Sequence, residues 1–277
     1  MKNKLFILTS FIIFSILIGS VTNKKDCRTE FFPTTELKPD NIPTKENIWV
    51  FMLAGQSNMA GRGKVEPMDT IPDPRILTIN KNGNLIIAKE PLHFYEPKMT
   101  GLDCGLSFGK ELLKHIPDSI SILIIPTAVG GSSINQWIND STHRNISLYS
   151  NFREKLKIGQ QYGMIKGILW HQGESDAATK EKIDAYSNQL KKLFGLFRSE
   201  AGNSTLPILI GELGSFSIWD ENWQALNEQI REYIETDSNA YLIKTTDLNH
   251  KGDKVHFDSE GQRKLGERFA EKFNQIK

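Results

Sequence analysis

Short apolar runs alternate with amphipathic helical patterns along most of this chain, and this alternation limits the folds that it can adopt. The apolar runs are bounded by polar residues or glycine, which is typical of strands buried in a sheet. We predict such strands at residues 48–53, 120–125, 168–170, 207–210 and 240–243. The stretch 67–100 shows no such pattern, and we expect it to run irregularly over the surface.

Between and after these runs, apolar residues recur at helical spacing. One predicted helical face carries Ile183, Tyr186, Leu190, Leu193, Phe194 and Phe197, a second carries Trp223, Leu226, Ile230 and Tyr233, and a third carries Leu265, Phe269 and Phe273. Strands that alternate with helices form mainly parallel sheets with helices on both faces. The sequence therefore predicts an α/β fold, in which ligands bind outside the carboxyl ends of the strands.

The N-terminal segment stands apart from this pattern. Lys2 and Lys4 precede an apolar run over residues 5–21, which is the composition of a secretory signal peptide. The run is also close to the length of a membrane span, so an uncleaved anchor is the open alternative. We expect an exported protein, periplasmic or extracellular, that consists of a signal peptide (1–21), a proline-containing linker or arm (22–46) and one folded domain (47–277).

Charge and cysteine content exclude several classes of protein. Lys and Arg number 34 and Asp and Glu 33, so the net charge of +1 gives no electrostatic reason to bind nucleic acid or an anionic membrane surface. Cys27 and Cys104 are the only cysteines, and in an exported protein they either pair or stay free. A CxxC motif is absent, so neither a zinc site nor a redox site is indicated.

A serine stands among glycines directly after the first predicted strand. Residues 55–63 read GQSNMAGRG, with Ser57 as the serine. Glycine lets the backbone turn sharply and lets a substrate approach closely. Ser57 is therefore a candidate nucleophile at the ligand-binding edge, and a turn serine or helix cap is the alternative.

A second serine, Ser107, lies in the sequence GLSFG at residues 105–109, which matches the G-x-S-x-G nucleophile elbow. That elbow requires a preceding strand, and residues 98–104 do not resemble one. We therefore place Ser107 in the first turn of a helix.

His256 and Asp253 lie in the polar stretch 247–258, between the last predicted strand and the last predicted helix. A serine nucleophile needs an adjacent base such as histidine, and a nearby carboxylate can hold the imidazole in the useful tautomer. A polar turn with a hydrogen-bonded histidine is one alternative. A metal site is another, because Asp247, His250, Asp253 and His256 recur every three residues. Since no H-E-x-x-H helix accompanies them, we expect neither a metal nor a cofactor.

Two further strand ends carry donors suited to developing negative charge. Gly130 and Gly131 follow the second predicted strand, where a turn can aim a backbone N–H outward, although a plain tight turn is the alternative. Gln172 follows the third predicted strand and adds a side-chain amide. We interpret Glu174, in the same loop, as a buried partner that fixes the loop.

Together these segments resemble the SGNH (GDSL-like) hydrolase superfamily and, within it, the sialate O-acetylesterase type, which includes carbohydrate esterase family six. The matching segments are GQSNMAG (55–61), GGSSINQW (130–137), WHQGESD (170–176) and the terminal Asp253-x-x-His256. Gln172 stands where the wider superfamily uses asparagine, and Gly-Gln-Ser replaces Gly-Asp-Ser, and both departures agree with the subgroup.

The resemblance implies a three-layer α/β/α sandwich of the flavodoxin-like type and metal-free hydrolysis of acetyl esters. It implies that Ser57 attacks the acetyl carbonyl, that His256 takes the serine proton and that Asp253 orients His256. The N–H groups of Ser57 and Gly131 and the amide of Gln172 are expected to hold the oxyanion. Further candidates for the sugar site are Gln56, Asn58, Arg62, Trp137, His171, Glu174 and His250.

We therefore predict an exported serine esterase that removes acetyl groups from acetylxylan, sialic acid or another sugar through an acyl-enzyme. A carbohydrate-binding protein on the same fold without activity is the alternative, but binding alone needs no triad. A metal-dependent phosphoesterase is a third reading, which sensitivity to a chelator would reveal. Neither the sugar nor the oligomeric state follows from the sequence.

Overall fold

A twisted sheet of seven strands forms the centre of the protein in the computed structural model, which describes residues 27–277. The predicted signal peptide lies outside the described residues. The strands, in the spatial order β3-β2-β4-β1-β7-β8-β9, are β1 (Ile48–Gly55), β2 (Ile76–Ile79), β3 (Leu85–Ile87), β4 (Ser121–Pro126), β7 (Met164–His171), β8 (Ile208–Gly211) and β9 (Ala240–Ile243). Neighbouring strands run parallel except for β2 and β3, which pair antiparallel.

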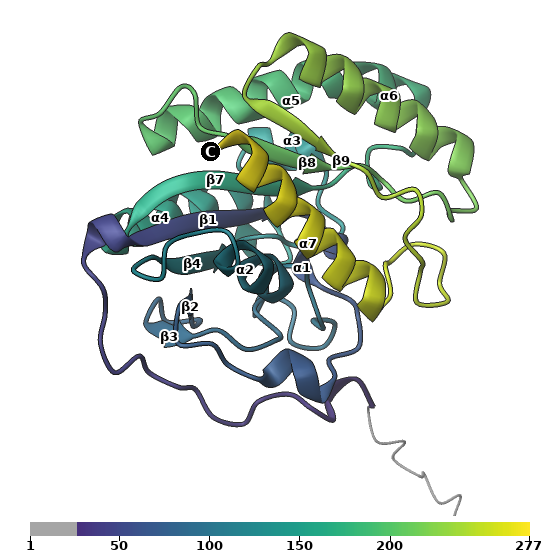
Figure 1. Cartoon of the computed structure of the whole chain (residues 1–277). Coiled ribbons are helices and arrows are strands. Elements are labelled where there is room, and N and C mark those ends of the chain that lie inside the picture. The colour runs from purple at the N-terminus through teal and green to yellow at the C-terminus, as the bar shows by residue number, and fades with distance from the viewer. Residues whose placement is uncertain (1–26) are drawn as a thin grey trace, which may run out of the picture.

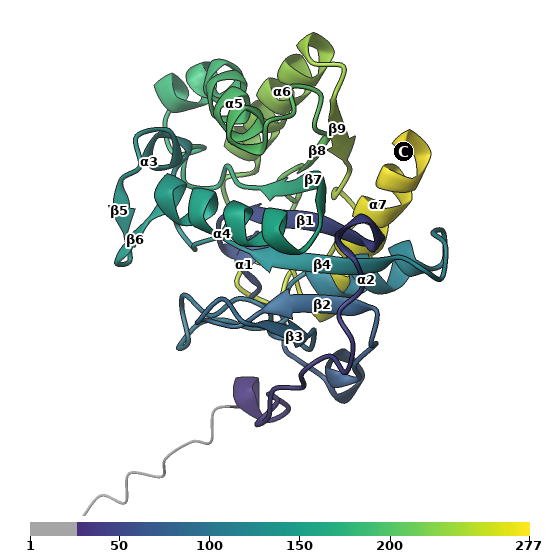
Figure 2. The same cartoon turned by 90° about the vertical axis from the view of Figure 1, so that its left-hand side faces the viewer.

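Helices cover both faces of this sheet (Figure 1, Figure 2). α2 (Gly105–Leu113) and α7 (Ser259–Ile276) lie on one face, and α3 (Ile134–Ile138), α4 (Leu148–Tyr162), α5 (Lys180–Ala201) and α6 (Asp220–Thr236) lie on the other. The remaining elements are the short helix α1 (Ser57–Ala60), the hairpin of β5 (Thr142–His143) and β6 (Ile146–Ser147), and the 3₁₀ turns Cys27–Thr29, Lys45–Asn47 and Pro67–Thr70. The predicted three-layer α/β/α fold with a mainly parallel sheet is confirmed.

Packing on the central strand explains why its sequence is apolar throughout. Val50 and Met52 pack into the core on the side of α4 and α5, whereas Phe51 and Leu53 pack on the side of α2 and α7. The Phe51 ring meets Phe108 of α2 and Phe273 of α7 edge-on, with ring centroids 4.7 and 4.8 Å apart. β1 is therefore held from both faces, which makes its carboxyl end a rigid platform.

The prediction for residues 67–100 was wrong, because this stretch contributes two strands to the sheet. All four residues of β2 are buried beside β4, and β3 folds back on β2 after a turn at Asn80. Strands of four and three residues are too short to show a clear apolar pattern. The sheet consequently extends further on this side than the sequence indicates.

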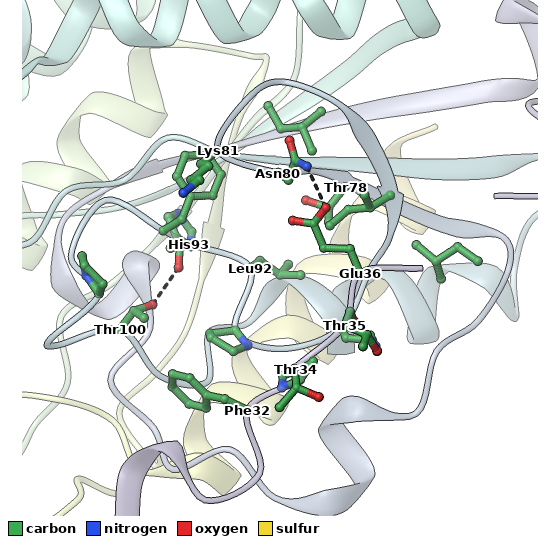
Figure 3. Close-up of a pocket in the computed structure, with 18 residues that line it drawn as sticks. Phe32, Thr34, Thr35, Glu36, Thr78, Asn80, Lys81, Leu92, His93 and Thr100 are labelled. Carbon is green, nitrogen blue, oxygen red and sulfur yellow. Dashed lines mark hydrogen bonds between the residues drawn. The ribbon is translucent and has the colours of Figure 1, made fainter. Parts of the chain in front are cut away.

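Residues 27–46, which we call the arm, lie along the β3 edge of the sheet (Figure 1). The backbone oxygen of Leu37 accepts a hydrogen bond of 2.8 Å from the N–H of Ile87 in β3, and Asn80 donates one of 2.8 Å to Glu36. Between the arm, β2, β3 and residues 91–100 lies a cavity of about 550 Å³ (Figure 3). The arm thus forms one wall of a cavity in the folded protein.

Two further findings concern the described residues. Cys104 is a buried free thiol, so the disulfide that the sequence left open is not formed in this structure. Of the helices within residues 27–277, none is long and apolar enough to cross a membrane.

Candidate active site

The central strand delivers Ser57 to the carboxyl edge of the sheet. β1 lies between β4 and β7, at the point where the chain changes from one side of the sheet to the other, and ligands bind at such points in open α/β sheets. Gly55 ends β1 with a φ of 138°, and a Cβ on it would lie 2.1 Å from the backbone oxygen of His171. Only glycine fits there, and the chain turns at once into α1, whose first residue is Ser57.

A continuous line of hydrogen bonds joins Ser57, His256 and Asp253. The Ser57 Oγ lies 3.0 Å from Nε2 of His256, although the two residues are 199 positions apart in the chain. Nδ1 of the same ring lies 2.8 Å from Oδ2 of Asp253. The other oxygen of Asp253 accepts the backbone N–H groups of Val255 and His256, at 3.0 and 2.9 Å. The structure therefore brings together all three residues of the predicted triad.

The pKa of Asp253 suits a carboxylate that accepts a hydrogen bond from the imidazole ring. Partial burial acts to raise the pKa of this carboxyl, but hydrogen bonds from the His256 ring and from two backbone N–H groups outweigh it and hold the pKa well below its usual range. The ionised carboxylate accepts a hydrogen bond from the N–H at Nδ1 of His256. Nε2 is then the ring nitrogen free to accept a proton from Ser57.

A cavity of about 280 Å³ lies over Ser57 and His256. Residues from the loops that follow β1, β4, β7, β8 and β9 line it. It is lined by Gln56, Ser57, Arg62, Met99, Gly130, Gly131, Arg144, Glu174, Ser175, Trp219, Trp223, Val255 and His256. The larger cavity beneath the arm, shown in Figure 3, contains none of the triad residues, so we place the candidate site at the cavity over Ser57 and His256.

The backbone N–H groups of Ser57 and Gly131 lie at this cavity. Gly131 has a φ of 75°, a conformation that glycine adopts without strain. Within residues 27–277, no acceptor pairs with the N–H of Gly131 or with that of Ser57. Both groups are therefore available to a negatively charged oxygen, as the sequence predicts.

Gln172, by contrast, is not available as an oxyanion donor, which corrects the prediction. Its side chain is fully buried, and its Nε2 donates to Asp176 at 2.6 Å, to the backbone oxygen of Ser132 at 3.0 Å and to Gln56 at 3.2 Å. Its amide oxygen accepts from the Tyr186 hydroxyl. Because the N–H groups of its side-chain amide point to these buried acceptors, Gln172 connects neighbouring loops by hydrogen bonds and does not line the cavity.

Gln56, and not Gln172, is the glutamine that lines the cavity. Its amide oxygen accepts from Gln172 and from the backbone N–H of Ser175, each at 3.2 Å. Its Nε2 has no acceptor in the described part of the chain, and the residue lines the cavity beside Ser57. Gln56 can therefore present an amide N–H to the site, held in orientation by the bonds on its oxygen.

Three predicted sugar-binding residues lie outside the cavity. Trp137 is fully buried, donates to the Ser132 hydroxyl at 2.9 Å and packs edge-on against the core residue Trp170. His171 is also fully buried, and burial lowers the pKa of its ring. The Nδ1 of His250 accepts two backbone N–H groups of its own loop.

Asn58 also lies away from the cavity, since it is 1% exposed. Arg62 and Glu174, in contrast, line it as predicted. Arg144 and Trp219 line it too, and sequence reasoning missed both. Trp219 directly precedes α6 and is 57% exposed, which is an unusual position for a tryptophan but leaves no mark in a single sequence.

One wall of the cavity carries more positive than negative charge. Glu96 accepts hydrogen bonds from Arg62 at 2.8 Å, from Arg144 at 2.5 Å and from the backbone N–H of Gly130 at 2.7 Å. Burial acts to raise the pKa of Glu96, but these donors outweigh it and lower the pKa. One carboxylate therefore faces two guanidinium groups, and Arg144 reaches the wall from the tip of the β5–β6 hairpin.

The alternative readings of two sequence features can now be judged. Ser107 lies in the first turn of α2 and donates to the backbone oxygen of Cys104 at 3.0 Å, so its predicted placement is confirmed. Asp247 pairs with Arg268 at 2.6 Å instead of facing the triad. No group of three or more metal-ligating side chains gathers anywhere in residues 27–277.

The fold and the strand-end site define a class, the three-layer α/β/α proteins that carry a serine, a histidine and an aspartate together at the carboxyl edge of the sheet. The chain belongs to the family described as carbohydrate esterase, sialic acid-specific acetylesterase, whose sequence pattern matches residues 47–275. It is 28% identical over 241 residues to a probable carbohydrate esterase of Arabidopsis thaliana, which covers 81% of this chain and 89% of that protein.

Solved structures agree with this assignment. An X-ray structure of the Arabidopsis thaliana protein superposes with a TM-score of 0.72 at 27% identity, over 81% of this chain and 97% of that one. The crystal structure of NanS gives a TM-score of 0.66 at 19% identity, over 85% and 99%. A carbohydrate acetylesterase from Xanthomonas citri gives 0.57 at 19% identity, over 81% and 55%. The last two are similar in fold.

Proposed function

We propose that this protein is an exported serine esterase that hydrolyses O-acetyl esters of sugars through an acyl-enzyme on Ser57. The observation that carries the proposal is the line Asp253–His256–Ser57, with contacts of 2.8 and 3.0 Å, beneath the cavity. Its occurrence in a carbohydrate esterase family member supports a sugar ester as the substrate. The residues present supply a base, a nucleophile and donors for an oxyanion without further groups.

In the first half of the reaction, Ser57 is acylated. His256 takes the proton from the Ser57 hydroxyl as the oxygen attacks the acetyl carbonyl, and Asp253 stabilises the imidazolium that results. The negative charge moves to the carbonyl oxygen, and the backbone N–H groups of Ser57 and Gly131 and the side-chain amide of Gln56 donate hydrogen bonds to it in this proposal. A preorganised donor of this kind is worth roughly 2.7–4 kcal/mol in known acyl-transfer sites.

The first tetrahedral intermediate then collapses: the imidazolium of His256 gives its proton to the departing sugar oxygen, the bond between this oxygen and the acyl carbon breaks, and Ser57 is left acetylated. In the second half, the same groups act on water. Water then enters, His256 removes one of its protons, and the hydroxide attacks the acetyl-serine carbonyl. The collapse of this second tetrahedral intermediate releases acetate and returns the proton to Ser57.

The mouth of the cavity suits a sugar ring. Trp219 presents an exposed aromatic face on one side, and apolar ring faces of sugars pack well on such surfaces. Arg144, which also lines the cavity and pairs with Glu96, offers hydrogen-bond donors. Acetylated xylan and O-acetylated sialic acid are both proposed substrates, and their relative rates would distinguish them.

Release of acetate tests the proposal directly. Purified residues 22–277 would be given p-nitrophenyl acetate, acetylated xylan and O-acetylated sialic acid, with S57A and H256A as variants and S107A as a matched serine control. Wild type and S107A should release acetate, S57A should release none, and a chelator should change nothing. Activity of S57A near that of wild type, or full loss with the chelator, would contradict the proposal.

Export is a separate part of the proposal and rests on residues 1–21. Expression of the full chain in a bacterium, followed by fractionation and mass spectrometry of the N-terminus, measures it. A cytoplasmic protein that keeps Met1 would overturn this part and leave the chemistry untouched.

A further inference from the structure

Asn58, the residue after the proposed nucleophile, holds the backbone on both sides of His256. Its Nδ2 donates to the backbone oxygen of Val255 at 3.0 Å, and its Oδ1 accepts the N–H of Phe257 at 3.0 Å. The side chain is 1% exposed, so water does not compete for these bonds. One amide therefore clamps the segment that carries the proposed base to the turn that carries the nucleophile.

Glu174 fixes the direction of this amide. Its Oε1 lies 2.6 Å from Nδ2 of Asn58, and its side chain is 5% exposed. A carboxylate only accepts hydrogen bonds, so the nitrogen of Asn58 must face Glu174 and Val255, and the oxygen must face Phe257. This arrangement agrees with the interpretation of Glu174 as a residue that fixes the loop, and it joins three strand ends through one side chain.

Few other bonds attach the His256 segment to the body of the protein. Asp253 and His250 accept N–H groups from residues 252–256, and these bonds shape the loop internally. Residues 251–254 are exposed, and Lys254 has a φ of 57°. Besides Asn58, the buried ring of Phe257 is what anchors the segment next to His256.

We propose that Asn58 is the positioning residue that sets the distance between His256 and Ser57, and that Glu174 positions Asn58. This inference rests on the proposed function, because it assigns residues to the same site. Asn58 touches neither the cavity nor the reacting atoms, so it acts through His256. A misplacement of about 1 Å can cost roughly 100-fold in rate, which sets the scale of the effect.

Four variants separate the parts of the clamp. N58A removes it, and kcat for p-nitrophenyl acetate should fall about 100-fold with KM nearly unchanged. N58D keeps the acceptor for Phe257 but turns an oxygen toward Val255 and Glu174, so it should be as poor or poorer. E174Q keeps an acceptor for Asn58, so its loss of kcat should be smaller than that of N58A. N58D combined with E174Q restores a donor–acceptor pair and should recover part of the loss.

A matched control distinguishes positioning from mere stability. Asn227 is fully buried and clamps the N–H and the oxygen of Leu213 at 2.8 and 3.0 Å, outside the triad. N227A should lower the melting temperature as N58A does, yet keep kcat and its pH profile. For N58A, the acid limb of the kcat profile should shift, and the reaction of Ser57 with a sulfonyl fluoride should slow in proportion to kcat.

The outcomes are distinct. Near-normal kcat in N58A, or equal losses of kcat in N58A and N227A, would overturn the positioning role. Failure of the double variant to exceed N58D would overturn the part assigned to Glu174. Absence of esterase activity in wild type, or full activity in S57A, would overturn the proposed function instead.

Discussion

Replacement of Asp253 by asparagine removes the charge that faces His256 and leaves the shape of the side chain almost unchanged. Asp253 contacts the ring at 2.8 Å, and the two side chains are 37% and 19% exposed. Water therefore reaches this pair, and its electrostatic worth must be smaller than that of a fully buried pair. We predict an intermediate loss of activity for D253N.

The size of the loss follows from the local dielectric. Opposite unit charges about 4 Å apart attract by about 1 kcal/mol in water and by about 4 kcal/mol at an effective dielectric constant of 20. A pair that is one-third exposed should lie between these limits, at roughly 2–3 kcal/mol. Since each 1.36 kcal/mol is tenfold in rate, kcat should fall by about 30- to 200-fold, less than the roughly 10⁴-fold loss for a buried triad aspartate.

The assay is kcat and kcat/KM for p-nitrophenyl acetate across a pH series. D247N is the matched control, because Asp247 lies on the same segment and pairs with Arg268 without touching the triad. It should stay within about twofold of wild type. H256A and the double variant D253N/H256A should be equally poor, since Asp253 acts only through His256.

Two results would refute this reasoning. A change below about threefold in D253N would mean that Asp253 neither orients nor stabilises the ring. A loss of about 10⁴-fold would mean that exposure of the pair does not weaken it, contrary to the dielectric argument.

Three other predictions concern the donors, the cavity mouth and the core. Q56A should lower kcat for p-nitrophenyl acetate about 100-fold with little change in KM. An unchanged kcat would mean that Gln56 does not donate a hydrogen bond to the oxyanion. W219A should raise KM for acetylated xylan about tenfold and leave p-nitrophenyl acetate unaffected; equal effects on both substrates would contradict a sugar-binding role. Glu90 is fully buried, and burial together with Asp103 raises its pKa, so the stability it contributes is present below about pH 4.5 and is lost as pH rises through its raised pKa. The melting temperature of wild type should therefore fall more between pH 5 and 8 than that of E90Q, and parallel curves would contradict this sign.

The sequence predicted the parts of the fold that repeat a strong pattern. β1, β4, β7, β8 and β9 are apolar because both faces of a parallel sheet are covered, and α5, α6 and α7 carry regular apolar stripes. β2 and β3 are too short for such a pattern. α4 was also missed, because its buried residues, Leu148, Phe152, Lys155, Leu156 and Gly159, include a lysine and a glycine.

The structure brings the three residues of the predicted triad together, whereas other predicted side chains point in directions that the sequence did not indicate. Ser57, Asp253 and His256 follow from their places at strand ends, which the sheet alone brings together. The direction of Gln172 depends on acceptors from three other segments, and no single segment encodes it. Trp137 has the composition of a sugar-binding residue, but its place in the core is set by packing on Trp170.

The arm covers part of the β3 edge, and this affects how readily separate molecules could pair through their sheets. An edge strand offers unpaired N–H and C=O groups to any other extended chain, and uncovered edges lead to aggregation. Here the arm occupies part of the β3 edge, through the bond between Leu37 and Ile87. A protein shortened to begin at Ile48 would keep every proposed site residue, yet it would expose that edge to its neighbours. The residues before β1 thus cover part of an edge strand that would otherwise be open to pairing with another extended chain.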